Sequence, residues 1–323
     1  MSARVQRQAA ITALVIGIGL AVAPAIFQMF DRAPKGGDMI DEFEPYMTSA
    51  KIDTFAGYLD LIDAANSETI ALRDEMVAQG SISAEEYDTT YAGASALNGQ
   101  WATIDEDMGD LIARMDRNLD NYEAVAALPP FPLFPWFFFL PGLMIAAIAT
   151  VLLWRLRSRN SHRGLVWVLV CFGVALVAAP AVFQMFTRAP KGGEMIDDFR
   201  PMMTIDRVRN VQGYFITLGS AEGQLRVGLL PAFTESGGDL GDYPEVTEFS
   251  AQWPTIVQDF NPMIATMRDN IENFEAVAAL PPFPLFPWFF VAPGVIVAGM
   301  AAVALRRSPS PDSTPTQTGG NPS

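Results

Sequence analysis

Glu123 to Phe138 read E-A-V-A-A-L-P-P-F-P-L-F-P-W-F-F, and the same letters return from Glu275 to Phe290. A second motif, A-P-A-I-F-Q-M-F-D-R-A-P-K-G-G-D-M-I-D-E-F from Ala23 to Phe43, returns with four substitutions from Ala179 to Phe199. Similarity nearly vanishes in the middle of the segments that separate the two motifs. The pattern predicts a tandem duplication whose copies keep one design where the motifs lie.

Four long apolar blocks accompany the motifs, and their interiors carry no charged residue. Each has about 18–24 residues, the length that a helix needs to cross a hydrocarbon core about 30 Å thick. Arg4 and Arg7 before the first block are typical of a signal peptide. Because Pro24 follows the small residues of this block and the same design recurs internally, we expect an uncleaved anchor. The predicted transmembrane helices are residues 9–30, 135–154, 164–187 and 287–305.

Charge is distributed unevenly along the chain, whose formal net charge is −15. Of the 36 acidic residues, all but Asp312 lie in the two segments that follow the first and third blocks. Arginines gather instead before the first block, between the second and third, and after the fourth. Since Lys and Arg near span ends mark the cytoplasmic side, we expect a multi-pass plasma-membrane protein. Its predicted cytoplasmic parts are residues 1–8, the turn 155–163 and a disordered tail 306–323.

The acidic segments 31–134 and 188–286 are predicted to be extracytoplasmic helical hairpins. Apolar residues recur in them every three or four positions, which is typical of helices with one apolar stripe. Two single-striped hairpins bury their stripes most simply against each other. The predicted fold class is an all-α membrane protein with four transmembrane helices in two tandem two-span repeats and an extracytoplasmic four-helix bundle. The candidate core residues of this bundle are Phe43, Phe55, Leu59, Trp101, Ile104, Met108, Met115, Phe199, Phe215, Trp253, Ile256, Phe260 and Met267.

Local signals predict the ends of several elements. The A-P-K-G-G of each copy should break the helix, so that Asp38 and Glu194 open new ones. Ser83 with Glu86 three residues later predicts an extra short helix up to about Leu97. In the second copy, Pro231 and the stretch from residue 237 to 244 predict a loop.

The proline-rich motif P-P-F-P-L-F-P-W-F-F is predicted to be an extended elbow in the outer interface, because its prolines deny backbone donors. It is either a joint that sets the angle of the bundle or a docking surface for a partner or lipid. The basic residues after the first and third spans either anchor lipid headgroups or recognise an anionic ligand. The candidate interface and lipid-anchor residues are Arg32, Lys35, Arg188, Lys191, Phe131, Phe134, Trp136, Phe283, Phe286 and Trp288.

Catalytic and metal chemistry have few residues to work with. The only histidine, His162, lies in the predicted cytoplasmic turn, and the only cysteine, Cys171, lies within a span. D-E-D-M-G-D at Asp105–Asp110 lacks the spacing of a calcium loop and is interpreted as a solvated helix face. Trp101 and Trp253 occupy equivalent positions on the apolar stripes. They either pack in the core or line a ligand cleft. We expect no enzyme activity, no cofactor and no metal.

The sequence therefore favours a non-enzymatic membrane protein of a bacterial cell envelope. Its bundle is expected to bind a partner protein, an envelope component or a small ligand, as a sensor or scaffold without an output domain of its own. The alternative is an accessory or pore-lining subunit of a transport complex. The expected partners are membrane lipids and a membrane protein or a second copy of the chain. Nucleic acid is not expected, because the exterior is acidic.

Overall fold

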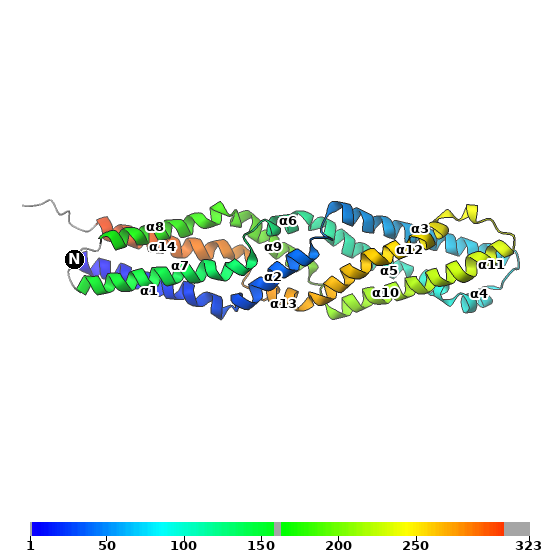
Figure 1. The fold of residues 1–323 in the computed structure, drawn as a ribbon, viewed down its shortest axis with the longest axis horizontal. Coiled ribbons are helices and arrows are strands. Elements are labelled where there is room, and N and C mark those ends of the chain that lie inside the picture. The colour runs from blue at the N-terminus through cyan, green and yellow to red at the C-terminus, as the bar shows by residue number, and fades with distance from the viewer. Residues whose placement is uncertain (1, 158–162, 307–323) are drawn as a thin grey trace, which may run out of the picture. The chain divides into compact units, whose positions relative to one another are not determined.

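The structure, a computed structural model, describes residues 2–157 and 163–306. Every regular element within these residues is a helix (Figure 1). The chain divides into two compact units. We call Met1–Ala33, Leu128–Ala189 and Leu280–Ser323 the apolar unit, and Pro34–Ala127 with Pro190–Ala279 the acidic unit.

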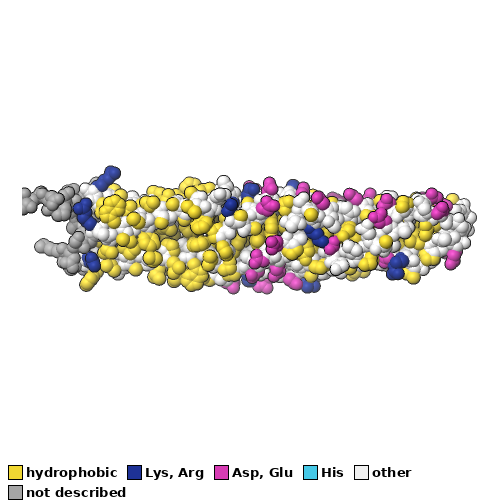
Figure 2. Space-filling model, turned by 45° about the horizontal axis from the view of Figure 1, so that its top comes forward, with side chains coloured by type: hydrophobic (Ala, Val, Ile, Leu, Met, Phe, Trp, Pro, Cys, Tyr) yellow, Lys and Arg dark blue, Asp and Glu magenta, His cyan; other side chains and the backbone are white. Residues whose placement is uncertain are grey.

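The apolar unit contains four long helices, α1 (Ser2–Ile26), α7 (Phe134–Arg157), α8 (Arg163–Val182) and α14 (Phe286–Arg306). Each is long and apolar enough to cross a membrane, so the predicted all-α class, with four helices able to span a membrane, is confirmed. Hydrophobic side chains cover the face of this unit that Figure 2 shows. Part of the predicted cytoplasmic turn, including His162, and nearly all of the predicted tail lie outside the described residues.

Glycines let these helices approach closely in two pairs, α1 with α7 and α8 with α14. A Cβ atom added to Gly17 would lie only 2.6 Å from the backbone nitrogen of Ala146, and one added to Gly142 would lie 2.5 Å from that of Ala21. Gly173 and Gly294 make the same contact between α8 and α14. Small residues at such crossings are what allows helices to pack tightly where no water drives them together.

Helix α1 ends at Ile26 and α8 ends at Val182, and two residues after each end lies a glutamine with positive φ. Gln28 and Gln184 adopt φ of 54° and 53°, after which α2 (Met29–Phe43) and α9 (Met185–Phe199) begin. These helices run through the A-P-K-G-G segments, so the predicted break there is wrong. Ala33 is 1% exposed, and its tight packing outweighs the low helix propensity of the neighbouring Pro and Gly residues.

Four long helices of the acidic unit each contact two neighbours, in the closed order α3, α5, α10, α12 and back to α3. Figure 1 shows them running side by side. Their bounds are α3 Ser49–Ala78, α5 Ala92–Arg117, α10 Ile205–Gln224 and α12 Pro244–Asp269. Two shorter helices, α6 (Leu119–Ala126) and α13 (Ile271–Ala278), follow α5 and α12.

Each hairpin has an outgoing arm, which comes first in the chain, and a returning arm, which follows it. The apolar stripe predicted for each arm is divided between two helices. On the outgoing side, Thr48 caps α3 by accepting a hydrogen bond from the backbone of Lys51, and Thr204 caps α10 in the same way through Arg207. On the returning side, the breaks lie at Asn118 and Asn270. The threonine caps could have been found, since each follows a proline by three residues and Ser/Thr is favoured at that position.

The far ends of the two halves differ, as expected, but not in every detail. Ser83 does cap a helix, α4 (Ala84–Thr90), by accepting from the Glu86 backbone at 3.1 Å, although α4 ends earlier than predicted. Pro231 lies in a helix, contrary to prediction, because it occupies the first turn of α11 (Leu230–Glu235), where no backbone donor is needed. A π-helical turn, η2 (Leu225–Leu229), precedes α11, and a 3-10 turn, η3 (Leu240–Asp242), follows it.

The proline-rich motif is extended over fewer residues than predicted. Pro130 is extended, with ψ of 128°, but 3-10 turns follow at η1 (Phe131–Leu133) and, in the second copy, at η4 (Phe283–Leu285). Helix α7 then begins at Phe134, with Pro135 in its first turn. A proline is tolerated there because the first amides of a helix have no intrahelical acceptor.

Candidate functional site

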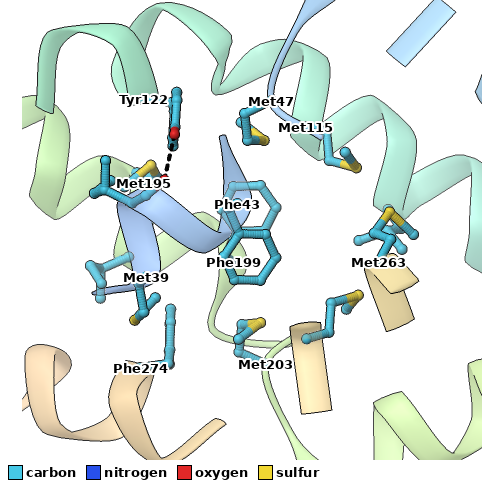
Figure 3. Close-up of a pocket in the computed structure, with 14 residues that line it drawn as sticks. Met39, Phe43, Met47, Met115, Tyr122, Met195, Phe199, Met203, Met263 and Phe274 are labelled. Atoms are coloured by element: carbon cyan, nitrogen blue, oxygen red, sulfur yellow. Dashed lines mark hydrogen bonds between the residues drawn. The ribbon is translucent and has the colours of Figure 1, made fainter. Parts of the chain in front are cut away.

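The acidic unit contains a partly open cavity of about 70 Å³ (Figure 3). Its lining draws on α2 and α9, on the turns that follow them, and on the returning helices of both halves. Each lining residue has its counterpart from the other half of the chain in the lining as well. The seven pairs are Met39 and Met195, Ile40 and Ile196, Phe43 and Phe199, Met47 and Met203, Leu111 and Met263, Met115 and Met267, and Tyr122 and Phe274.

The cavity is apolar, and half of its lining residues are methionines. None of the fourteen carries a charge. The one hydroxyl among them, that of Tyr122, is occupied, since it donates to the Ile40 carbonyl at 2.6 Å. Burial, followed by the charges of Glu44 and Asp41, raises the pKa of Tyr122 to about 12, so it stays a neutral donor. Methionine is flexible and polarisable, so the walls can adapt to an apolar guest.

Phe43 and Phe199, one from each half of the chain, overlap in the middle of the cavity view in Figure 3. Both were predicted to be core residues, and both are only half-buried. Their rings line the cavity, which accounts for the incomplete burial.

Two buried asparagines beside the cavity tie the halves together. Asn118 donates to the Asp198 carboxylate at 2.6 Å, and its counterpart Asn270 donates to Glu42 at the same distance. Both asparagines are at most 2% exposed. Arg114 adds an ion pair to Asp198 at 2.6 Å. Asn118 lies between α5 and α6 and bonds to α9 of the other half. Asn270 lies between α12 and α13 and bonds to α2 of the other half.

A second matched pair of polar contacts, which we call the aspartate clamps, joins the long helices. In one clamp, Asp259 of α12 accepts from the Tyr58 hydroxyl at 2.8 Å and lies 2.7 Å from the Lys51 ammonium. Burial raises the pKa of the Asp259 carboxyl, but hydrogen bonds from Lys51 and Tyr58 lower it more, so the net shift is downward. Burial and then the bond to Asp259 raise the pKa of Tyr58 to about 12.

The other aspartate clamp holds Asp107 of α5 between Tyr214 and Arg207 of α10. Arg207 stands where Lys51 stands in the first half, and its guanidinium lies 2.6 Å from the Asp107 carboxylate. Sequence reasoning missed both clamps and placed Asp107 on a solvated helix face. The available signal was the recurrence, at matching positions of the two halves, of a basic residue, a tyrosine seven residues later and an aspartate.

The predicted lipid-anchor lysines contact protein groups within the acidic unit. Lys35 forms an ion pair with Glu272 at 3.1 Å, and Lys191 donates to the Asp120 carbonyl at 3.4 Å. Arg32 and Arg188 belong to the apolar unit and are half-buried. The two lysines therefore bridge the halves of the chain in this structure.

Most phenylalanines of the proline-rich motif face each other inside the apolar unit. Phe134 lies 6.2 Å from its counterpart Phe286, and Phe138 lies 4.5 Å from Phe290, measured between ring centroids. Phe131, Phe134 and Phe286 are buried, and Phe283 is half-buried against Phe286. In this structure the buried rings contact protein side chains, and the assignment of the motif to the membrane interface stays a prediction. A motif that packs against its own copy has a physical reason to be identical in both halves.

Trp136 and Trp288 differ from these rings, since they are 44% and 55% exposed. Trp101 is buried in the acidic unit and donates to Asp63 at 2.5 Å, whereas Trp253 is half-buried and stacks on Phe215. Phe215, another predicted core residue, is half-buried. The remaining predicted core residues are buried, namely Phe55, Leu59, Ile104, Met108, Met115, Ile256, Phe260 and Met267.

The acidic run Asp105–Asp110 lies within α5. Burial, followed by the charges of Asp63 and Asp60, raises the pKa of Asp105. Across residues 2–157 and 163–306, no three His, Cys, Asp or Glu side chains are grouped so as to hold a metal ion. The Met-lined cavity is therefore the candidate site. Comparison of the chain with protein-family models, with curated proteins and with solved structures found no significant match.

Proposed function

We propose that this chain is a multi-pass plasma-membrane protein whose acidic unit is an extracytoplasmic four-helix bundle that binds a small apolar ligand in the Met-lined cavity. It acts without catalysis, as a sensor or scaffold in a cell envelope. The observation that carries the proposal is the cavity itself. Evenly packed cores leave few voids, whereas here seven matched pairs of apolar residues surround one.

The proposed orientation rests on charge, and the proposed span of α7 is supported by its aromatic residues. Basic residues gather at the ends of the spans opposite the acidic segments, which favours cytoplasmic termini. Trp136 and Trp154 are exposed near opposite ends of α7. At about 1.5 Å per residue they are separated by about 27 Å, close to the thickness of a hydrocarbon core. Tryptophans at both levels are typical of membrane interfaces.

The size of the cavity limits the ligand. A volume of about 70 Å³ is roughly half of the ~150 Å³ that accommodates benzene in a protein interior. A ligand of several carbon atoms therefore requires the methionines to move. Such movement would displace α2 and α9, which line the cavity through Met39 and Met195 and begin at Met29 and Met185 in the apolar unit. A separate membrane protein, or a second copy of this chain, would respond to that displacement.

The test uses the full chain in lipid nanodiscs with ¹³C-labelled methionine methyl groups and benzene as the probe. The resonances of Met115 and Met267, which line the cavity, should shift in a saturable way. Those of Met76 and Met108, which are buried in the same unit but do not line the cavity, should stay in place. Met39→Phe, which fills the cavity, should abolish the shift. Equal shifts at all four methionines, or none, would contradict the proposal.

A further inference from the structure

A larger hollow lies between α7 and α8 in the apolar unit. It has a volume of about 200 Å³ and sits near the Phe134 end of α7 and the Val182 end of α8. We call it the α7–α8 groove. Its lining residues include Phe134, Phe172, Ala175, Leu176, Phe183 and Phe290. All of them are apolar, so a water molecule inside would find no side chain to bind.

The groove breaks the correspondence between the two halves. α1 and α14 contact each other more extensively than α7 and α8 do. At the matching positions of the other half, Ile16 replaces Phe172 and Gly19 replaces Ala175. The helices therefore separate on one side of the apolar unit more than on the other.

The walls of the groove combine an exposed edge with a buried floor. Ala175 is exposed and Phe183 is 39% exposed, so the groove opens on the outer surface of the apolar unit. Leu176 and Phe290 are buried at 5% and 4% exposure. An apolar chain could thus enter from the side and reach buried side chains.

We propose that one acyl chain of a membrane phospholipid occupies the α7–α8 groove. Both helices are apolar enough to cross a membrane, so the groove opens toward hydrocarbon chains. Its volume exceeds the ~150 Å³ at which an apolar protein cavity takes up benzene. Because no charged or hydrogen-bonding side chain lines it, the groove holds the chain and does not select the headgroup. An acyl chain there provides the van der Waals contacts that the side chains lining an empty groove would lack.

The experiment places the full chain in nanodiscs that contain a trace of phosphatidylcholine with a diazirine near the middle of one acyl chain. After irradiation, peptide mass spectrometry should find label on Leu176 and little on Leu20, its counterpart in α1, which is also buried. Equal labelling of the two leucines, or labelling of neither, would overturn the proposal, and this comparison needs no variant.

A substitution provides a second readout. Ala175→Phe fills the groove from its exposed edge and should abolish the Leu176 label. Val174→Phe, at a neighbouring position that is 55% exposed and outside the groove, should preserve it. Retention of the Leu176 label in Ala175→Phe would count against an acyl chain in the groove. Neither result depends on the Met-lined cavity.

Discussion

Asp259 of α12 lies between the hydroxyl of Tyr58, at 2.8 Å, and the ammonium of Lys51, at 2.7 Å, both on α3. The contact joins residues about 200 positions apart and links the two halves of the chain. Asp107 is held in the same way by α10. Apolar stripes alone tolerate sliding of one helix along another, whereas such paired polar contacts fix one register. We therefore expect the aspartate clamps to fix the alignment of the halves in the acidic unit.

Asp259→Asn should lower the free energy of unfolding by about 1 kcal/mol, because it removes an ion pair and weakens a charged hydrogen bond at a partly exposed site. Thermal and denaturant unfolding of the full chain in detergent, followed by circular dichroism, would measure the change. Asp206→Asn is a suitable control, since the carboxylate of Asp206 pairs with Arg209 of its own helix and is 89% exposed. Equal effects of the two substitutions would show that the aspartate clamp does not stabilise the fold.

Acid should weaken the clamp of Asp259. The folded pKa of this carboxyl lies below its usual value because the bonds from Lys51 and Tyr58 outweigh the effect of burial. A carboxyl whose pKa is lower in the folded state stabilises the fold at pH values above its unfolded pKa of about 4. That contribution disappears as the pH falls through the folded pKa. The difference in melting temperature between the native chain and Asp259→Asn should therefore shrink from pH 6 to pH 3; a difference that stays constant would show that the charge is not responsible.

Met115→Asp should destabilise the acidic unit by about 3 kcal/mol or more, since it places a charge in an apolar position that is 4% exposed. Ala113→Asp, on the exposed face of the same helix, is the matched control and should change stability little. Helicity and melting temperature of both variants provide the comparison. If Met115→Asp melts like the native chain, the packing around the cavity is not what we describe.

Gly17→Leu should separate α1 from α7 and lower the free energy of unfolding by about 2–3 kcal/mol, because its side chain would meet the backbone of α7. Gly19→Leu offers a control two residues away, since nothing lies within 4 Å of a Cβ atom there. Melting of the purified variants in detergent distinguishes them. Similar losses for both would mean that glycine matters for helix flexibility and not for the close contact.

The sequence could predict the helical class and the four spans because long uncharged blocks have few structural alternatives. Helix breaks were harder. Gln28 and Gln184 break their helices although glutamine is a good helix former, and the break became visible only through φ. Conversely, Pro34 sits inside α2, where packing overrides local preference.

The candidate site was only partly predictable. Met115 and Met267 were recognised from helical spacing, but spacing cannot show whether a stripe is fully packed or leaves a cavity. The aspartate clamps escaped because each joins distant residues of different halves. The identical proline-rich motifs suggested an interface with lipid, whereas Phe134 and Phe286 contact each other. When a residue contacts its own counterpart, the same position is constrained in both halves of the chain. The letter-for-letter repetition of the motif could have indicated such a contact.

The orientation of the acidic unit is tested most directly by labelling intact cells with a membrane-impermeant maleimide. Single cysteines would replace the exposed residues Glu85, Glu235 and Gly164 in a chain that carries Cys171→Ala. We predict rapid labelling at positions 85 and 235, and labelling at position 164 only after the membrane is permeabilised. Labelling at 164 in intact cells with protection at 85 and 235, or opposite results for 85 and 235, would contradict an extracytoplasmic bundle built from both halves.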